Sequence, residues 1–208
     1  MLSPTRVRDL LEPFGLGLAS EHVDKLLIYL ELLLKWNAKI NLVGQAAAEE
    51  CVTRHFGESL FLPRLVALRG RLLDIGSGAG FPGLALKILC PALEVTLLEP
   101  VAKKRAFLKE VARVCQFEGV QVLGDRLKDF SPRAPAAKFD FATSRAVGGF
   151  ETLVKHAAEC LSPRGMLCLW LGHEDAASIV AVESRFDWRP PQPIPLSRRR
   201  EIIIGELL

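Results

Sequence analysis

The residues best suited to chemistry form a glycine-rich segment, residues 74 to 83, with the sequence Asp-Ile-Gly-Ser-Gly-Ala-Gly-Phe-Pro-Gly. It follows the apolar run Leu72–Ile75, so the sequence predicts a buried strand that ends in a glycine turn and feeds a helix. Such a turn lets the backbone approach a ligand closely and aims free N–H groups at it. The dinucleotide fingerprint G-x-G-x-x-G fits poorly, because its third glycine falls on Phe81, which is too large for close helix–strand packing. A purely structural tight turn is the alternative.

The remaining pattern, Asp-x-Gly-x-Gly-x-Gly, is typical of methyltransferases that bind S-adenosylmethionine. This ligand has a carboxylate for N–H groups, an ammonium for an acid, and two ribose hydroxyls. Glu99 ends the next predicted strand and could accept hydrogen bonds from both hydroxyls, as an acid in that place does in nucleotide-binding folds. We therefore expect S-adenosylmethionine as the cofactor, with Gly76, Gly78 and Glu99 among the residues that bind it.

Two further segments follow predicted strands. Asp125-Arg126-Leu127-Lys128 comes after the third strand, where an adenine ring would meet backbone groups and an apolar side chain; an ordinary charged loop is the alternative. Arg145 follows the fourth strand, at the carboxyl edge where ligands sit in open α/β sheets. We expect Arg145 to be a site residue rather than part of the ordinary surface.

These residues require an α/β scaffold. From Leu72 onward, short apolar runs alternate with longer amphipathic segments, which indicates β-α-β units and a parallel sheet. The expected fold is a Rossmann-like sheet of the class I methyltransferase type, with helices on both faces and an N-terminal helical appendage. The expected strands are Leu72–Ile75, Val95–Leu98, Val120–Leu123, Phe139–Ala142, Met166–Trp170 and Glu201–Gly205.

The first seventy residues lack such runs. Ser3-Pro4 is a helix-start signal, and Gly15 and Gly17 end that helix. Ser20-Glu21 opens a longer amphipathic helix whose pattern dissolves after Trp36, and residues 47–67 again look helical, with a break at Pro63. We expect a helical segment at 1–68 and a cofactor-binding domain at 69–208. The proline-rich residues 190–195 predict a stiff connector before the last strand.

Composition narrows the function classes. With 208 residues, 50% apolar and 25% charged, the chain is neither disordered nor fibrous. A net charge of +3 does not by itself announce a nucleic-acid partner. Two basic clusters, residues 103–113 and Arg198–Arg200, are candidate RNA contacts, with ordinary solvated charge as the alternative.

The remaining composition points to the cytoplasm. The five cysteines form no C-x-x-C pair and no metal-ligand spacing with histidines, so we expect free thiols in a reducing compartment and no metal. The N-terminus has no export signal, and the richest apolar stretch, 26–34, contains Glu31 and is too short for a membrane span. We expect a cytoplasmic monomer without membrane contact.

Several motifs together resemble one family, the guanine-N7 methyltransferases of small-subunit ribosomal RNA, formerly called glucose-inhibited division protein B. Residues 35–42 are similar to its K-W-N-x-x-x-N-L, and residues 54–59 to its R-H-x-x-D-S. Residues 76–83 match G-[ST]-G-x-G-x-P-G, residues 103–108 match K-[KR]-x-x-F-L, and residues 144–146 match S-R-A. The resemblance covers nearly the whole chain.

Carried over by position, the resemblance implies cofactor contacts at Gly76, Phe81, Glu99, the Leu127–Lys128 pair and Arg145. It implies ribosomal RNA or the small ribosomal subunit as partner. The chain departs from the family pattern at three positions, where the family usually has Glu, Lys and Lys and this sequence has Lys128, Leu171 and Gly205. Compensation by Arg198–Arg200, a different RNA footprint or weakened activity would each account for the two missing lysines.

The implied chemistry needs no general base, because guanine N7 has an exposed lone pair and no proton. We assign no catalytic residue; His55 is the one histidine considered for the site, either as a structural hydrogen-bonding group or as a site contact. Two other functions stay open. One is a small-molecule methyltransferase on the same fold, and the other is a non-catalytic RNA-binding or partner-binding module with a degenerate cofactor pocket.

Overall fold

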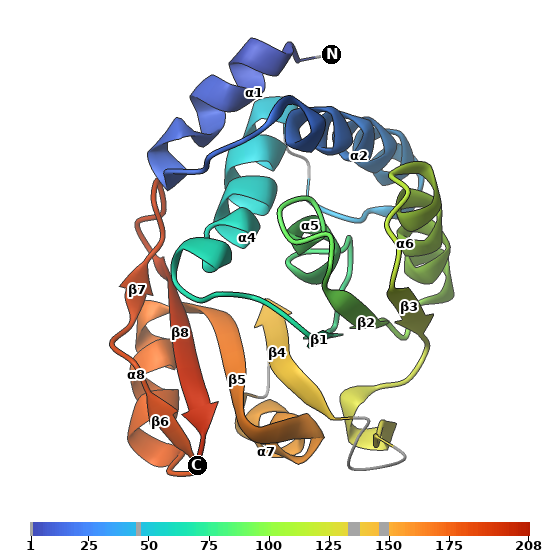
Figure 1. Cartoon of the computed structure of the whole chain (residues 1–208). Helices are drawn as coiled ribbons and strands as arrows, with labels where there is room; N and C mark the ends of the chain where they lie inside the picture. Colours follow the sequence, from blue (N-terminus) through green and yellow to red (C-terminus); the bar gives the residue numbers. More distant parts are fainter. Residues whose placement is uncertain (1, 45–46, 133–137, 146–149) are drawn as a thin grey trace.

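A computed structural model of the chain describes residues 2–44, 47–132, 138–145 and 150–208. Its centre is one sheet in the order β3-β2-β1-β4-β5-β8-β6, with β7 paired to β8 (Figure 1). The strands from β3 to β5 run parallel, and β8 pairs antiparallel with β5, β6 and β7. The strands are β1 Arg71–Ile75, β2 Glu94–Leu98, β3 Val120–Leu123, β4 Phe139–Arg145, β5 Leu161–Gly172, β6 Phe186–Trp188, β7 Gln192–Pro193 and β8 Arg200–Leu207.

Helices precede the sheet and connect its strands. The α-helices are α1 Pro4–Leu11, α2 Ser20–Ile40, α3 Ala48–Glu50, α4 Glu58–Leu60, α5 Gly83–Leu86, α6 Ala102–Val114, α7 Phe150–Cys160 and α8 His173–Val182. A π-helical stretch, Cys51–Gly57, joins α3 to α4, and 3-10 turns lie at Glu12–Phe14, Leu62–Arg64 and Leu127–Asp129. Within the described part of the chain, no helix is both long and apolar enough to cross a membrane.

Each face of the sheet carries its own hydrophobic cluster because successive side chains in a strand point to opposite faces. Leu72 of β1 belongs to a cluster that also contains side chains of α1, α2, the π-helical stretch, α5 and α6. Leu73, the next residue, belongs to the cluster on the opposite face, which contains side chains of α7 and α8. Figure 1 shows the N-terminal helices in blue and teal lying together with α5 and α6 on one side of the sheet, and α7 and α8 on the other.

The predicted α/β fold with helices on both faces is confirmed, and all six expected strands are present. Two short strands were not predicted. β6 has only three residues, too few for an alternating pattern, and β7 lies inside the proline-rich stretch. Pro193 is tolerated there because an edge strand does not need every N–H group for the ladder.

Helix α2 continues beyond the point where its apolar pattern dissolves, as far as Ile40. Asn41 ends it in the left-handed conformation, at φ 50°. The Asn37 side chain accepts hydrogen bonds from the N–H groups of Leu42 and Val43 at 2.7 and 2.9 Å. The two asparagines of the segment 35–42 therefore shape the exit from the helix.

Candidate functional site

The glycine loop after β1 is tied to the end of the neighbouring strand β2. The N–H groups of Gly76 and Ser77 both donate to the carbonyl of Leu98 at 3.0 Å. Gly76 has φ 70°, a left-handed conformation that glycine adopts without steric cost. The loop therefore turns sharply at the carboxyl edge of the sheet, where the sequence places it.

Glu99 follows β2 directly and is 4% exposed. One carboxylate oxygen accepts the N–H of Gly78 at 2.9 Å, and the other accepts the N–H of Val101 at 2.8 Å. A carboxylate oxygen offers about two lone-pair positions, so each oxygen keeps one acceptor position after these bonds. Glu99 is thus fixed in place and still able to accept two further hydrogen bonds, which is what a ribose diol requires.

Most backbone N–H groups of the loop are engaged within the protein. Those of Gly76–Gly78 donate to Leu98 and Glu99, and that of Gly80 donates to Ser77 at 2.6 Å. The N–H groups of Ala79 and Phe81 have no partner among the described residues. The sequence predicted that the loop aims free N–H groups at a ligand. Among the described residues, the N–H groups of Ala79 and Phe81 remain available for this, because the other loop N–H groups named here hold the shape of the loop.

A cavity of about 380 Å³ lies beside Gly76 and extends along the ends of β1 and β2. Its apolar wall consists of Ile75, Leu98, Pro100, Leu127 and Leu153. Asp125, Arg126 and Lys128 also line it, together with Thr152 and His156 of α7. An apolar slot with a few polar groups suits a flat heteroaromatic ring. The structure thus brings the predicted segment Asp125–Lys128 to the same cavity as Gly76.

Asp74, at the end of β1, is fully buried. Burial raises the pKa of its carboxyl from 3.8 to about 6, even though hydrogen bonding to Thr143, whose hydroxyl donates to it at 2.8 Å, to Ser77 and to the Gly83 backbone lowers it. Its Oδ2 atom has no hydrogen-bond partner among the described residues. A buried carboxyl beneath the glycine loop fits a cationic ligand group, because such a group would offset the cost of the buried charge.

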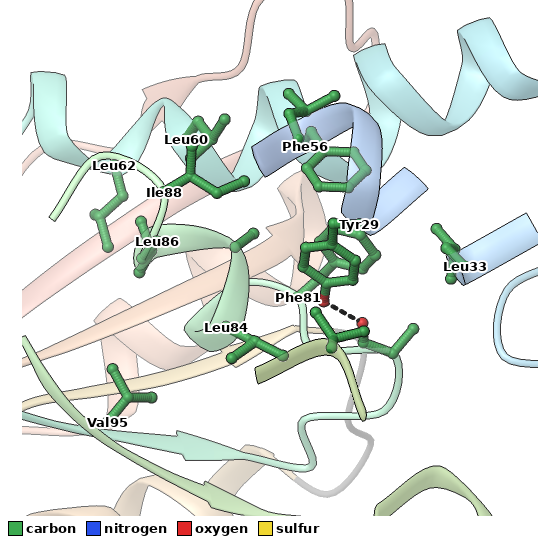
Figure 2. Close-up of a cluster of buried hydrophobic side chains, with 14 of the residues drawn as sticks. Tyr29, Leu33, Phe56, Leu60, Leu62, Phe81, Leu84, Leu86, Ile88 and Val95 are labelled. Carbon is green, nitrogen blue, oxygen red and sulfur yellow. Dashed lines mark hydrogen bonds between the residues drawn. The ribbon is translucent and has the colours of Figure 1, made fainter. Parts of the chain in front are cut away.

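Phe81 does not line the cavity; its side chain belongs to an aromatic cluster behind the loop. Tyr29 of α2 stacks on Phe81 at 5.5 Å between ring centroids, and Phe56 meets it edge-on at 4.9 Å. The Tyr29 hydroxyl donates to the carbonyl of Ala79 at 2.5 Å, the dashed line in Figure 2. A contact of Phe81 with a cofactor would therefore go through its main chain. Sequence reasoning missed Tyr29, because a tyrosine on an amphipathic helix looks like any core residue.

Arg145 also points elsewhere than toward the cavity. Its guanidinium lies 3.0 Å from the Glu58 carboxylate and donates to the carbonyls of Arg54 at 2.8 Å and His55 at 3.5 Å. Glu58 is also paired with Arg200 at the start of β8. Burial lowers the pKa of Arg145 to about 10, so it remains cationic at neutral pH. Arg145 thus ties the end of β4 to the π-helical stretch; Ala146, which follows it, lies outside the described residues.

His55 stacks on Phe81 at 5.2 Å with an angle of 24° between the rings. Burial, and after it the charges of Arg145, Arg54 and Arg200, lower the pKa of its imidazole from 6.5 to about 3. The ring is therefore neutral at pH 7. The structure places His55 next to Arg145 and the glycine loop. The sequence had left open whether His55 contacts the site or only forms structural hydrogen bonds.

The three departures from the resembled family occupy different environments. Lys128 is exposed at the cavity. Leu171 is 2% exposed in the cluster beneath α7 and α8. A Cβ atom at Gly205 would lie 2.6 Å from the Trp188 ring, so no side chain fits there without a shift. The positions of Leu171 and Gly205 are therefore used for packing.

No group of three or more His, Cys, Asp or Glu side chains in the described ranges is arranged to hold a metal ion. The residues present fit S-adenosylmethionine instead. Glu99 offers two acceptor positions, the cavity offers an apolar slot, and Asp74 offers an unpartnered carboxylate oxygen.

The strand order and the glycine loop define a class I methyltransferase. A solved structure of a SAM-dependent methyltransferase from Aquifex aeolicus shares this fold with a TM-score of 0.61 at 12% identity, covering 76% of this chain and 93% of that one. The chain belongs to the GidB family, rRNA small subunit methyltransferase G, whose family model matches residues 22–190.

Two curated relatives named ribosomal RNA small subunit methyltransferase G support this assignment. The protein from Desulfitobacterium hafniense is 41% identical over 73% of this chain, and the protein from Methylobacillus flagellatus is 40% identical over 76%. The matched stretch spans 63% of the first relative's length and 73% of the second's.

Proposed function

We propose that this chain transfers the methyl group of S-adenosylmethionine to N7 of a guanosine in 16S ribosomal RNA, in the cytoplasm. Membership in the rRNA small subunit methyltransferase G family supports the RNA substrate. The observation that carries the cofactor assignment is Glu99, fixed by two backbone N–H groups with two acceptor positions left beside an apolar cavity.

The proposed cofactor contacts follow from these positions. Glu99 accepts the ribose hydroxyls, Gly76 allows close approach of the backbone, and Leu127 and Pro100 cover the adenine ring. Lys128 lines the same cavity and contributes through its main chain, so its departure from the family's Glu is tolerated. Asp74 supplies negative charge for the cofactor's ammonium group. The cofactor, when bound, supplies an electrophilic methyl group on a sulfonium.

The target atom explains why no proton-transfer residue is needed. Guanine N7 is a free nucleophile, so the protein has to position it, exclude water and leave its lone pair unpaired. An arginine that donated to both O6 and N7 would block the reaction. Arg145 does not block N7 in this way, because its guanidinium is bound to the Glu58 carboxylate and to two backbone carbonyls.

The RNA is held through its phosphates in this proposal. Of the two basic clusters, part is used internally: Arg105 donates to the carbonyls of Glu99 and Pro100, and Arg200 pairs with Glu58. Lys103, Lys109, Arg198 and Arg199 are exposed and are the proposed phosphate contacts. Exposed cations of this kind give binding that weakens as salt is added.

The test is a methyl-transfer assay with labelled S-adenosylmethionine and two substrates, intact small ribosomal subunits and naked 16S RNA, both lacking the modification. We expect label on N7 of one guanosine in at least one substrate. Label on a metabolite but on no RNA would contradict the proposal and favour a small-molecule methyltransferase. Cofactor binding without any transfer would favour a binding module with a degenerate pocket.

A further inference from the structure

His55 lies close to the glycine loop but outside the proposed cofactor site. The cavity beside Gly76 lies over the ends of β1 to β3 and under α7. His55 does not line this cavity; it stacks on Phe81 of the glycine loop and lies next to Arg145 at the end of β4 and to Arg200 at the start of β8. A substrate that approaches the loop from the side of β4 and β8 meets this histidine rather than Glu99.

The position of His55 is fixed through its main chain. Its carbonyl accepts hydrogen bonds from the Ser59 hydroxyl at 2.6 Å and from Arg145 at 3.5 Å. Arg145 and Arg200 are both bound to Glu58, which is 4% exposed. Among the described residues, the ring contact of His55 is its stacking on Phe81. Neither ring nitrogen is hydrogen-bonded to another residue that the structure describes, and the side chain is half-buried rather than enclosed.

Burial and the charged groups around His55 favour the neutral form of its imidazole. Arg54, Arg145 and Arg200 are the cations near His55, and Glu58 is the anion that two of them share. Burial and these cations lower the pKa of His55 to about 3. A neutral imidazole has one donor and one acceptor nitrogen and adds no positive charge. That matters here, because the sulfonium is cationic and guanine N7 becomes cationic as it is methylated.

We infer that His55 contacts the target guanine directly, through a hydrogen bond between an unpartnered ring nitrogen and the polar edge of the base that leaves N7 free. The inference rests on the proposed function and adds to it a residue that touches the substrate. Stacking on Phe81 sets the plane of the ring, and Phe81 belongs to the glycine loop. The base and the cofactor are thereby positioned from the same rigid element, which is what a transfer between them requires.

The experiment compares the wild type with His55→Phe, His55→Asn and the control His173→Phe. Phenylalanine at 55 keeps an aromatic ring to stack on Phe81 and removes both nitrogens, whereas asparagine keeps a donor and an acceptor. His173 is exposed at the start of α8. Each protein is measured for affinity for S-adenosylmethionine by calorimetry, for thermal unfolding, and for kcat and KM in methyl transfer to 16S RNA.

We expect His55→Phe to lower kcat/KM by roughly 10- to 100-fold, the range expected when one hydrogen bond to a base is lost and its partner is left unpaired. Cofactor affinity stays within about 2-fold of the wild type, the range of an unchanged contact. His55→Asn recovers part of the loss, and His173→Phe behaves as the wild type.

Unchanged kcat and KM in His55→Phe, with an active wild type, would overturn this inference and leave the proposed function standing. Lost cofactor binding in His55→Phe would also overturn it, by showing that the histidine acts through the glycine loop. Absence of RNA methylation by the wild type would overturn the proposed function and this inference with it.

Discussion

At the scale of single residues, the site depends on groups whose hydrogen bonds are only partly used. Glu99 accepts two backbone N–H groups and keeps two acceptor positions. Asp74 keeps an unpartnered oxygen, and His55 keeps two unpartnered nitrogens within the described ranges. Buried polar groups are usually satisfied, so spare capacity in three side chains around one loop favours a ligand there.

A single substitution at Gly76 is expected to remove cofactor binding and to leave the fold intact. We expect Gly76→Asp to abolish measurable binding of S-adenosylmethionine, because the side chain enters the cavity that Gly76 lines and brings a second negative charge near Glu99. Aspartate tolerates the left-handed conformation at φ 70° at a cost of about 1 kcal/mol, so the fold survives.

Calorimetric titration with the cofactor and the far-UV circular dichroism spectrum check this expectation. Gly17→Asp is the matched control, since no atom lies within 4 Å of a Cβ placed at Gly17. An affinity of Gly76→Asp equal to that of the control would show that the cofactor binds elsewhere.

The sequence predicted which residues lie near the cavity better than it predicted the contacts that each side chain makes. Gly76, Glu99 and Leu127 lie around one cavity or next to it, because each follows a parallel strand and those strands end at one edge. The sequence did not show that Arg145 turns toward Glu58, since a pairing of residues 87 positions apart leaves no periodic signal. Nor did it show that Phe81 faces an aromatic cluster and not the cavity.

At the scale of elements, helix α2 supports the cofactor loop directly. Tyr29 is fully buried, and burial raises the pKa of its phenol well above the ordinary value, so the hydroxyl stays a donor. A Cβ at Gly80 would lie 2.1 Å from that hydroxyl, which shows how closely the helix approaches the loop. The N-terminal helices therefore share a hydrophobic cluster with the sheet and also shape the site.

We expect Tyr29→Phe to weaken binding of S-adenosylmethionine several-fold and to lower the free energy of unfolding by about 1–3 kcal/mol, because the buried carbonyl of Ala79 loses its donor. The remaining ring still stacks on Phe81, so the change is confined to one hydrogen bond. Urea unfolding and cofactor titration measure the two effects.

Leu33→Val is the control for this prediction. Leu33 is also fully buried on α2 and lies in the same cluster, and its shortening costs about 1 kcal/mol without removing a hydrogen bond. We expect the control to lose stability and keep its cofactor affinity. Equal affinity in Tyr29→Phe and Leu33→Val would mean that the hydroxyl does not support the loop.

The elements themselves were largely predictable, because strands β1 and β2 are mostly buried apolar runs and α2 has a clear amphipathic pattern. The irregular elements were not. The π-helical stretch Cys51–Gly57 has no sequence period that separates it from an α-helix, and its contacts with Phe81 and Arg145 come from distant parts of the chain.

At the scale of the whole molecule, the buried Asp74 and the half-buried His55 respond to acid in opposite ways. The pKa of Asp74 is raised from 3.8 to about 6, so its contribution to stability is full below pH 3.8 and is lost as the pH rises to about 6. The pKa of His55 is lowered from 6.5 to about 3, so its contribution is full above pH 6.5 and is lost as the pH falls toward 3. Both changes occupy the same pH range and offset each other.

Substituting one group at a time reveals the pH dependence that each group contributes to the unfolding free energy. We expect the difference in unfolding free energy between Asp74→Asn and the wild type to shift in favour of the variant by about 1–3 kcal/mol between pH 4 and pH 7, because a buried charge is no longer formed. The corresponding difference for His55→Phe shifts in favour of that variant as the pH is lowered from 7 to 4, because no half-buried imidazole has to be protonated. Urea unfolding at half-unit steps of pH gives both differences.

If either difference stayed constant across that range, the group concerned would titrate alike in the folded and unfolded states. For His55, a constant difference would remove the reason given for a neutral histidine beside a sulfonium.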